Sequence, residues 1–288
     1  MSKSLSLSWS DARYGGLRTI CESVESALAA TGVDFYYLIG AQARDLWYPP
    51  DKLSSRITRD VDFAILAAND AQFTAVKQVL SKQHGYEEIH DDGVRLHSPD
   101  GTTVDILPFG EIEAEDRTVL GGQGFTSIHV DGFREVANVG TAEAQLDGAG
   151  GPTFRIATLP SIVLLKLISY DDRPDQRAKD PEDIAYIFST YFDIVTNLFF
   201  YTHYDVLEGI DSGYAHMGAR VIGREMRLIL QQSATLDARV RGIVGAHIAA
   251  GVESKFIEIM ARESGLPIEE AIVILKSLQS GLDEVAPA

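Results

Sequence analysis

The segment at residues 59–65 constrains the fold more than any other, because charged and apolar residues alternate along it. Such alternation is typical of a β-strand with one buried face. Asp60 and Asp62 would share the other face, about 7 Å apart along the strand. Two carboxylates this close repel each other, and a divalent cation or basic partners usually hold such a pair. The segment therefore predicts a half-buried strand that carries a cation site.

A glycine turn precedes this strand. Residues 35–39 are aromatic and aliphatic, which predicts a buried strand, and Gly40 interrupts that run. Good helix formers follow until Pro49 and Pro50 end them. An Asp-x-Asp pair in an acidic protein is most often two solvated side chains on an exposed strand face. The strand, turn and helix that precede this pair favour a phosphate-facing site with metal-binding carboxylates over that alternative.

The predicted secondary structure changes near residue 158, from mixed strands and helices to helices alone. Helical spacing predicts a first helix that ends at Gly32 and another at residues 70–83. Short strands are predicted at 86–90, 94–98, 102–107, 126–130 and 154–157. Helices are predicted at 161–170, 181–190, 213–232, 235–249, 252–264 and 267–282. We therefore expect an α/β domain over residues 1–157 and a helical domain over residues 158–288.

Charge and cysteine content limit the possible partners and the compartment. The chain of 288 residues has a net charge of −17. Residues 1–157 carry 13 basic and 23 acidic side chains and the rest carry 12 and 19, so neither half is a basic nucleic-acid module. Cys21 is the only cysteine, which fits a reducing compartment. The first residues lack the apolar core of a signal peptide, and no apolar run is long enough for a membrane span, so we expect a soluble cytoplasmic protein.

Three sequence elements together resemble a known family. They are Leu-Ile-Gly-Ala-Gln-Ala-Arg at residues 38–44, Thr-Arg-Asp-Val-Asp-Phe at 58–63 and Val-Asp-Ile-Leu at 104–107. This set resembles the nucleotidyltransferase fold of the DNA polymerase β superfamily, and within it the AbiEii/MenT-type minimal bacterial nucleotidyltransferase toxins. The resemblance covers about residues 33–190, and it implies a mixed sheet flanked by helices and followed by an α-helical C-terminal domain. Downstream it includes Leu159, Pro160, Lys166, Arg173, Lys179, Asp180 and Asp183.

The resemblance also implies roles for single residues. Asp60 and Asp62 would bind two Mg²⁺ ions, for which Mn²⁺ could substitute, and Asp105 would bind one of them and orient or deprotonate the acceptor hydroxyl. A third carboxylate on a neighbouring strand is also what a two-metal site needs on chemical grounds. The residues implied to bind the nucleotide are Gly40, Ala41, Gln42, Arg44, Thr58, Lys166, Arg173, Lys179 and Asp180.

Some of these residues have plainer explanations. Lys166 lies within an apolar run, where it could also extend to water from an amphipathic helix. Asp180 could simply cap a helix that begins at Pro181, or it could hold Lys166 or Lys179 in place. A stripe of Arg220, Arg224 and Arg227 could pair with acids or bind an acceptor. The seven histidines show no close metal-ligand spacing, so a zinc site is not expected.

We therefore expect a Mg²⁺-dependent nucleotidyltransferase that moves an NMP from an NTP to a hydroxyl of an RNA, such as tRNA, or of a protein. The group resemblance implies a toxin–antitoxin or phage-defence role and a cognate antitoxin as a possible partner. Two alternatives stay open at this point. Ala41 stands where the family often has Ser, and the loop from Gly40 to Asp60 is long, as a non-catalytic nucleotide-binding or protein-interaction module would allow. Transfer to a small molecule such as an aminoglycoside would suit the acidic surface better than transfer to RNA.

Overall fold

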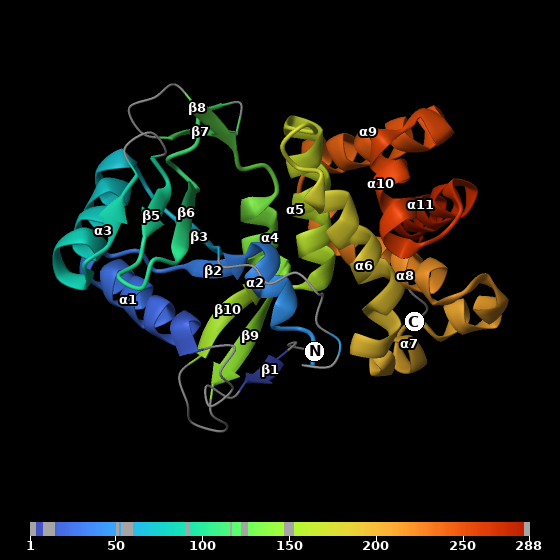
Figure 1. Ribbon diagram of the computed structural model, residues 1–288, viewed down its shortest axis with the longest axis horizontal. Helices are drawn as coiled ribbons and strands as arrows, with labels where there is room; N and C mark the ends of the chain where they lie inside the picture. The colour runs from blue at the N-terminus through green and yellow to red at the C-terminus, as the bar shows by residue number, and fades with distance from the viewer. Residues whose placement is uncertain are drawn as a thin grey trace. The chain divides into compact units, whose positions relative to one another are not determined.

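The computed structural model in Figure 1 contains two compact units. The first comprises Met1–Ala137 and Thr141–Thr158, and the second Asn138–Gly140 and Leu159–Ala288. That these units fold as separate domains, as we expect from the sequence, stays a prediction. The residues described are 4–7, 15–49, 52, 60–89, 93–115, 117–121, 126–146 and 153–284.

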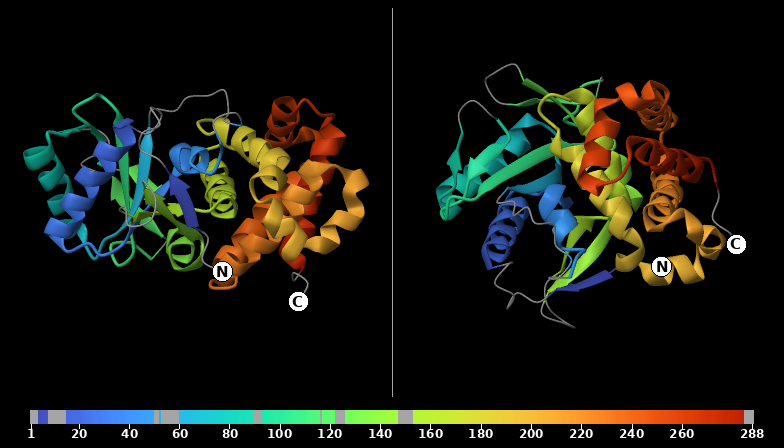
Figure 2. Two further views of the ribbon diagram at one scale, coloured as in Figure 1. Left: turned by 90° about the horizontal axis from the view of Figure 1, so that it is seen from below. Right: turned by 45° about the vertical axis from the view of Figure 1, so that its right-hand side comes forward.

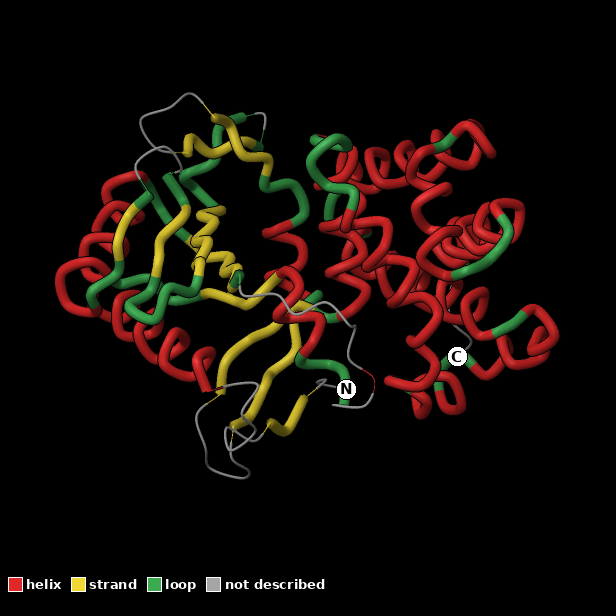
Figure 3. The backbone as a smooth tube through the Cα atoms, viewed as in Figure 1, coloured by secondary structure: helices red, strands yellow, loops and turns green. Residues whose placement is uncertain are grey.

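The first unit is built on a mixed sheet, visible in Figure 3 as the yellow segments. Among the described residues it has eight strands in the order β1-β9-β10-β2-β3-β6-β5-β4. The pairs β1/β9, β10/β2 and β3/β6 are parallel, and the other neighbours are antiparallel. A separate two-stranded antiparallel sheet pairs β7 (Thr118–Gly121) with β8 (Thr126–His129). The strands of the large sheet are β1 (Ser4–Leu7), β2 (Tyr36–Ile39), β3 (Val61–Leu66), β4 (Glu87–Glu88), β5 (Arg95–His97), β6 (Thr103–Phe109), β9 (Thr141–Leu146) and β10 (Thr153–Ala157).

Two helices, α1 (Gly15–Thr31) and α3 (Asp70–His84), pack against each other beside this sheet (Figure 1). They cover the face to which Tyr36 points, since its hydroxyl donates a hydrogen bond to Glu25 of α1. Tyr36 is in register with Ile65, so Ile65, Phe63 and the other alternate residues of β3 face the same way and are buried. The apolar half of the alternating segment therefore forms the core under α1 and α3.

The opposite face of the sheet is covered in part by the short helices α2 (Gly40–Asp45) and α4 (Phe133–Val139). The Tyr37 hydroxyl donates a hydrogen bond of 2.8 Å to the carbonyl of Phe133. The rings of Tyr37 and Phe133 both pack edge-on against Phe109, with centroids 5.9 and 6.2 Å away. These contacts tie β2 and β6 to α4 on the same face of the sheet as Asp62 and Asp105, at the other end of that face.

The second unit is helical, and α8 (Tyr214–Leu230) is its centre. A Cβ at Gly218 would lie 2.2 Å from a carbonyl of α6, and one at Gly223 would lie 2.4 Å from a carbonyl of α11. Glycines thus let three helices approach backbone to backbone. Figure 2 shows these helices from two further directions. The elements are α5 (Leu159–Asp172), α6 (Lys179–Ile194), α7 (Thr196–Tyr201), η3 (Tyr204–Ser212), α8, α9 (Ala234–Ala250), η4 (Gly251–Glu253), α10 (Lys255–Ser264) and α11 (Ile268–Asp283).

The predicted α/β fold with a mixed sheet, followed by helices, is confirmed. The sequence did not predict β1, β7, β9, α4, α7 or η3. Two boundaries were wrong. β3 begins at Val61, so Asp60 lies just before the strand, and α6 begins at Lys179, so Asp180 is not its N-cap. Within the described ranges, no helix has the length and apolar character needed to cross a bilayer.

Candidate active site

Asp62 and Asp105 lie directly opposite each other on paired strands. β3 and β6 run parallel, and Asp62 is in register with Asp105. Neighbouring strands are about 4.8 Å apart, so the two carboxylates leave the sheet side by side on one face. Because β3 alternates, this is the face that α1 and α3 do not cover. Two of the three carboxylates predicted to bind metal are therefore adjacent.

Gly40 lies against the first of these carboxylates. Ile39 at the end of β2 is in register with Asp62, and Gly40 follows with a φ of +72°. A Cβ at Gly40 would lie 2.1 Å from Oδ2 of Asp62 and 3.0 Å from its Cγ. Both the left-handed backbone and the missing side chain are thus required here. The glycine lets the chain turn into α2 directly beside the Asp62 carboxylate.

Asp60 is exposed at the entry to β3. The prediction that Asp60 and Asp62 both lie within the strand was wrong, because backbone pairing begins only at Val61, opposite Val104. Thr58, predicted to bind the nucleotide, lies outside the described residues. Asp60 thus lies just before the first residue of the strand that carries Asp62.

Asp105 is held by an arginine that the sequence analysis missed. Arg95 on β5 is in register with Asp105. Its Nε donates to Oδ1 of Asp105 and its Nη2 donates to Oδ2, each at 2.8 Å. The Arg95 side chain is 40% exposed and that of Asp105 is 14% exposed. Pairing Ser98 with Thr102, at the facing ends of the two predicted strands, and counting outward would have placed Arg95 opposite Asp105.

The donor set suits a hard divalent cation. Among the described residues, no group of three or more His, Cys, Asp or Glu side chains is arranged to hold a metal ion. Asp62 and Asp105 nevertheless offer adjacent carboxylate oxygens, which Mg²⁺ prefers, and Mg²⁺ often completes its octahedron with water and phosphate oxygens. These two residues, with Asp60 at the strand entry, therefore fit the group that the sequence implies.

The residues after Gly40 differ in how well they can reach a ligand. Ala41 and Gln42 are half-buried at the start of α2. Arg44, predicted to bind the nucleotide, has only 2% of its side chain exposed, and its Nη2 lies 2.6 Å from Oδ1 of Asp45. α2 has only six residues, so its dipole adds little. A phosphate contact at this turn depends mainly on the backbone around Gly40 and on Gln42.

In the second unit, Lys166 of α5 bridges two carboxylates of α6. Its Nζ lies 2.7 Å from Oδ1 of Asp180 and 2.8 Å from Oδ2 of Asp183. The lysine side chain is 13% exposed, and the two aspartates are 6% and 7% exposed. Burial alone would lower the pKa of Lys166, but the two carboxylates outweigh it and raise the pKa above its usual range. Asp180 therefore holds Lys166, which was one of the two roles considered for it.

The other basic residues fall into two groups. Arg173 is half-buried and Lys179 is exposed at the start of α6, so both are accessible. Arg224 is buried, and its guanidinium contacts Asp205 at 2.8 and 2.6 Å and also Glu284. The hydrogen bonds that Arg224 donates to Asp205 are the main cause of its raised pKa. Arg220 and Arg224 of the arginine stripe thus pair with acids within the helical unit, in agreement with the plainer explanation for these two residues.

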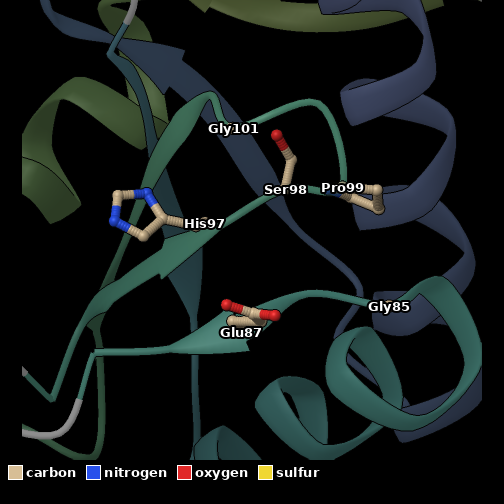
Figure 4. Close-up of a pocket in the computed structure, with 6 residues that line it drawn as sticks. All are labelled: Gly85, Glu87, His97, Ser98, Pro99 and Gly101. Carbon is tan, nitrogen blue, oxygen red and sulfur yellow. The ribbon is translucent and has the colours of Figure 1, made fainter.

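A shallow pocket of about 380 Å³ lies elsewhere in the first unit, at the edge of the sheet. Figure 4 shows that His97 and Glu87, on neighbouring strands, form part of its wall. None of the predicted site residues lines it. We therefore place the candidate active site at Asp62 and Asp105, where the register brings the chemistry together, and not at this pocket.

Comparison with known proteins identifies the family of the chain. Residues 34–268 match the family described as nucleotidyl transferase AbiEii toxin, type IV TA system. No curated protein sequence matches the chain. The solution structure of the antibiotic-resistance factor ANT(2'')-Ia is similar at 12% identity, covering 82% of this chain and 95% of that chain, with a TM-score of 0.36. The Bradyrhizobium diazoefficiens CD-NTase CdnG in complex with GTP is similar at 13% identity, covering 97% and 87%, with a TM-score of 0.31. The match over residues 34–268 shows that this chain belongs to the AbiEii family of nucleotidyltransferase toxins.

Proposed function

We propose that this protein transfers an NMP from an NTP to a hydroxyl of a macromolecular acceptor, with Mg²⁺ bound by Asp62, Asp105 and Asp60. The acceptor is an RNA, for which tRNA is the first candidate, or a protein. The observation that carries the proposal is the register of Ile39, Asp62 and Asp105, which sets the Gly40 turn and two carboxylates side by side.

The proposed transfer forms one bond to the α-phosphorus, breaks another and moves one proton. The acceptor oxygen attacks the α-phosphorus, the bond from that phosphorus to the bridging oxygen breaks, and pyrophosphate leaves. Bound Mg²⁺ would offset the charge that develops on the phosphates. Asp105 would orient the acceptor hydroxyl and take its proton, and the open backbone at Gly40 would let phosphate oxygens come close to Asp62.

Lys166, Arg173 and Lys179 are proposed to bind the triphosphate. Arg173 and Lys179 are accessible enough to do so directly. Lys166 already contacts Asp180 and Asp183. We therefore consider it a weaker candidate for a phosphate ligand than the sequence pattern indicated. The family assignment also implies an antitoxin, which we propose as the regulatory partner.

The test is incorporation of label from each of the four α-labelled NTPs, with Mg²⁺, into total cellular RNA and into total protein. We expect label in one macromolecular fraction, and its loss in Asp62→Asn and Asp105→Asn. Asp34→Asn is the matched control, because Asp34 is an exposed carboxylate in the same unit. Label in RNA or in protein would identify the acceptor class, and label in small molecules alone would favour the small-molecule alternative. A wild-type protein no more active than Asp62→Asn would contradict the proposal.

A further inference from the structure

The Arg95–Asp105 pair has a geometry that the proposed reaction does not require. Arg95 occupies both oxygens of Asp105, through Nε and Nη2 at 2.8 Å each. Two parallel N–H···O bonds of this kind are the strongest common arrangement between a guanidinium and a carboxylate. A cation at Asp105 must therefore either share these oxygens with Arg95 or displace it.

Charge explains why an arginine sits there. Asp62 and Asp105 are directly opposite each other, and Asp60 lies at the entry of the same strand as Asp62. Without a cation, the two adjacent carboxylates would repel each other. Arg95 supplies one positive charge at the edge of this group, where a divalent cation would supply two.

Exposure explains how the arginine can leave. With 40% of its side chain exposed, Arg95 can swing into water without opening a cavity in the core. The strand β5, which carries Arg95, lies between β6 and the edge strand β4. The contact between Arg95 and Asp105 can therefore be exchanged at low cost.

We propose that Arg95 is a built-in counter-cation that holds Asp105 in the metal-free protein and competes with the divalent cation for its oxygens. This inference rests on the proposed function, because it takes Asp105 as a metal ligand. It makes Arg95 a residue that sets the cation concentration at which the site forms. By reciprocity, cation binding weakens the Arg95–Asp105 contact to the same extent.

The experiment is a Mn²⁺ titration of the nucleotide-free full-length chain, followed by electron paramagnetic resonance of the free ion. Arg95→Ala should bind Mn²⁺ about two- to fivefold more tightly than wild type, since a partly exposed ion pair contributes up to about 1 kcal/mol and 1.4 kcal/mol is tenfold. Arg95→Lys keeps the positive charge but cannot form the two parallel N–H···O bonds. Its affinity for Mn²⁺ should therefore lie between that of wild type and that of Arg95→Ala.

Two controls separate this effect from general charge and from the metal site itself. Arg18→Ala removes the same charge from an exposed pair with Glu22 on α1 and should leave Mn²⁺ affinity unchanged. Asp105→Asn should weaken binding, and adding Arg95→Ala to it should give no gain.

The outcomes distinguish the two proposals. Unchanged or weaker binding by Arg95→Ala would overturn the role of Arg95, as would a gain that persists in the Asp105→Asn background. With either outcome, the proposed metal site stands if Asp105→Asn alone still weakens Mn²⁺ binding. If Asp105→Asn binds Mn²⁺ as wild type does, Asp105 is not a ligand and both proposals fail.

Discussion

The two units of this protein each pair a cation with carboxylates, and burial makes the pairs behave differently. In the first unit, Arg95 holds Asp105 with 40% of its side chain exposed. In the second, Lys166 holds Asp180 and Asp183 with 13% exposed. In an exposed pair, another cation can replace the side-chain cation. In a buried set, removal of the central cation leaves buried carboxylates without that charge, which is costly. The same chemistry is thus suited to binding in one unit and to structure in the other.

The buried set has a second feature that supports a structural role. Oδ2 of Asp180 is buried and makes no hydrogen bond within the described part of the chain. Asp180 is therefore held mainly through its other oxygen, by Lys166. Removing Lys166 would leave both aspartates without the cation that holds them.

The largest effect is expected from Lys166→Met. It should lower the free energy of unfolding by about 3–5 kcal/mol, because it leaves buried carboxylates uncompensated. Urea unfolding followed by circular dichroism measures this. Lys255→Met is the control, since Lys255 pairs with Glu258 at an exposed position, and its cost should stay below about 1 kcal/mol. The triple variant Lys166→Met/Asp180→Asn/Asp183→Asn should recover much of the loss. A cost for Lys166→Met no larger than that of the control would remove the contrast between the two pairs.

The next effect is expected from Gly40→Ala, which tests the exposed site. A left-handed alanine costs about 1–3 kcal/mol, and its Cβ must also push the Asp62 carboxylate away. Displacement of a reacting group by about 1 Å can cost on the order of 100-fold in rate, so NMP transfer should fall by about that much.

Gly32→Ala is the matched control for this prediction. Gly32 has a φ of +70° and no atom within 4 Å of an added Cβ, so it carries the strain without the clash. Melting temperature and transfer rate should be measured for both variants. Equal loss of transfer in the two would show that Gly40 acts through backbone strain alone and not through Asp62.

A smaller effect is expected from alkaline pH. Because the pKa of Lys166 is raised in the folded protein, its stabilising contribution is complete below the usual lysine pKa of 10.5 and is lost as pH rises beyond that value. The urea midpoint of wild type should therefore fall relative to that of the triple variant above about pH 10.5. Parallel curves for the two proteins across that range would contradict this sign.

The smallest effect is expected from Arg95→Ala on stability in the absence of metal. The pair is partly exposed, so the loss should be at most about 1 kcal/mol, far below that of Lys166→Met. Saturating Mn²⁺ should then raise the melting temperature of this variant more than that of wild type. A loss of stability as large as that of Lys166→Met would mean that Arg95 serves the fold and is not exchangeable.

Much of the fold followed from local patterns. The strand with Asp62, the turn at Gly40 and six of the helices of the second unit appear close to their predicted positions, because each has strong periodicity or a clear glycine or proline boundary. Short elements such as β1 and β9 have little local signal and form by pairing with each other across most of the first unit. Their existence depends on contacts that no short window of sequence contains.

The sequence by itself indicated which residues are candidates for chemistry: two aspartates in an alternating segment, a third on a later strand, and a lysine within an apolar helix. Tertiary structure decided what each of them meets. The parallel register put Asp105 beside Asp62, and the adjacent antiparallel strand put Arg95 on Asp105. Helix packing buried Lys166 between two aspartates. The physical reason is that partners and burial depend on neighbours distant in the chain, whereas strand and helix periodicity depends on residues close in sequence.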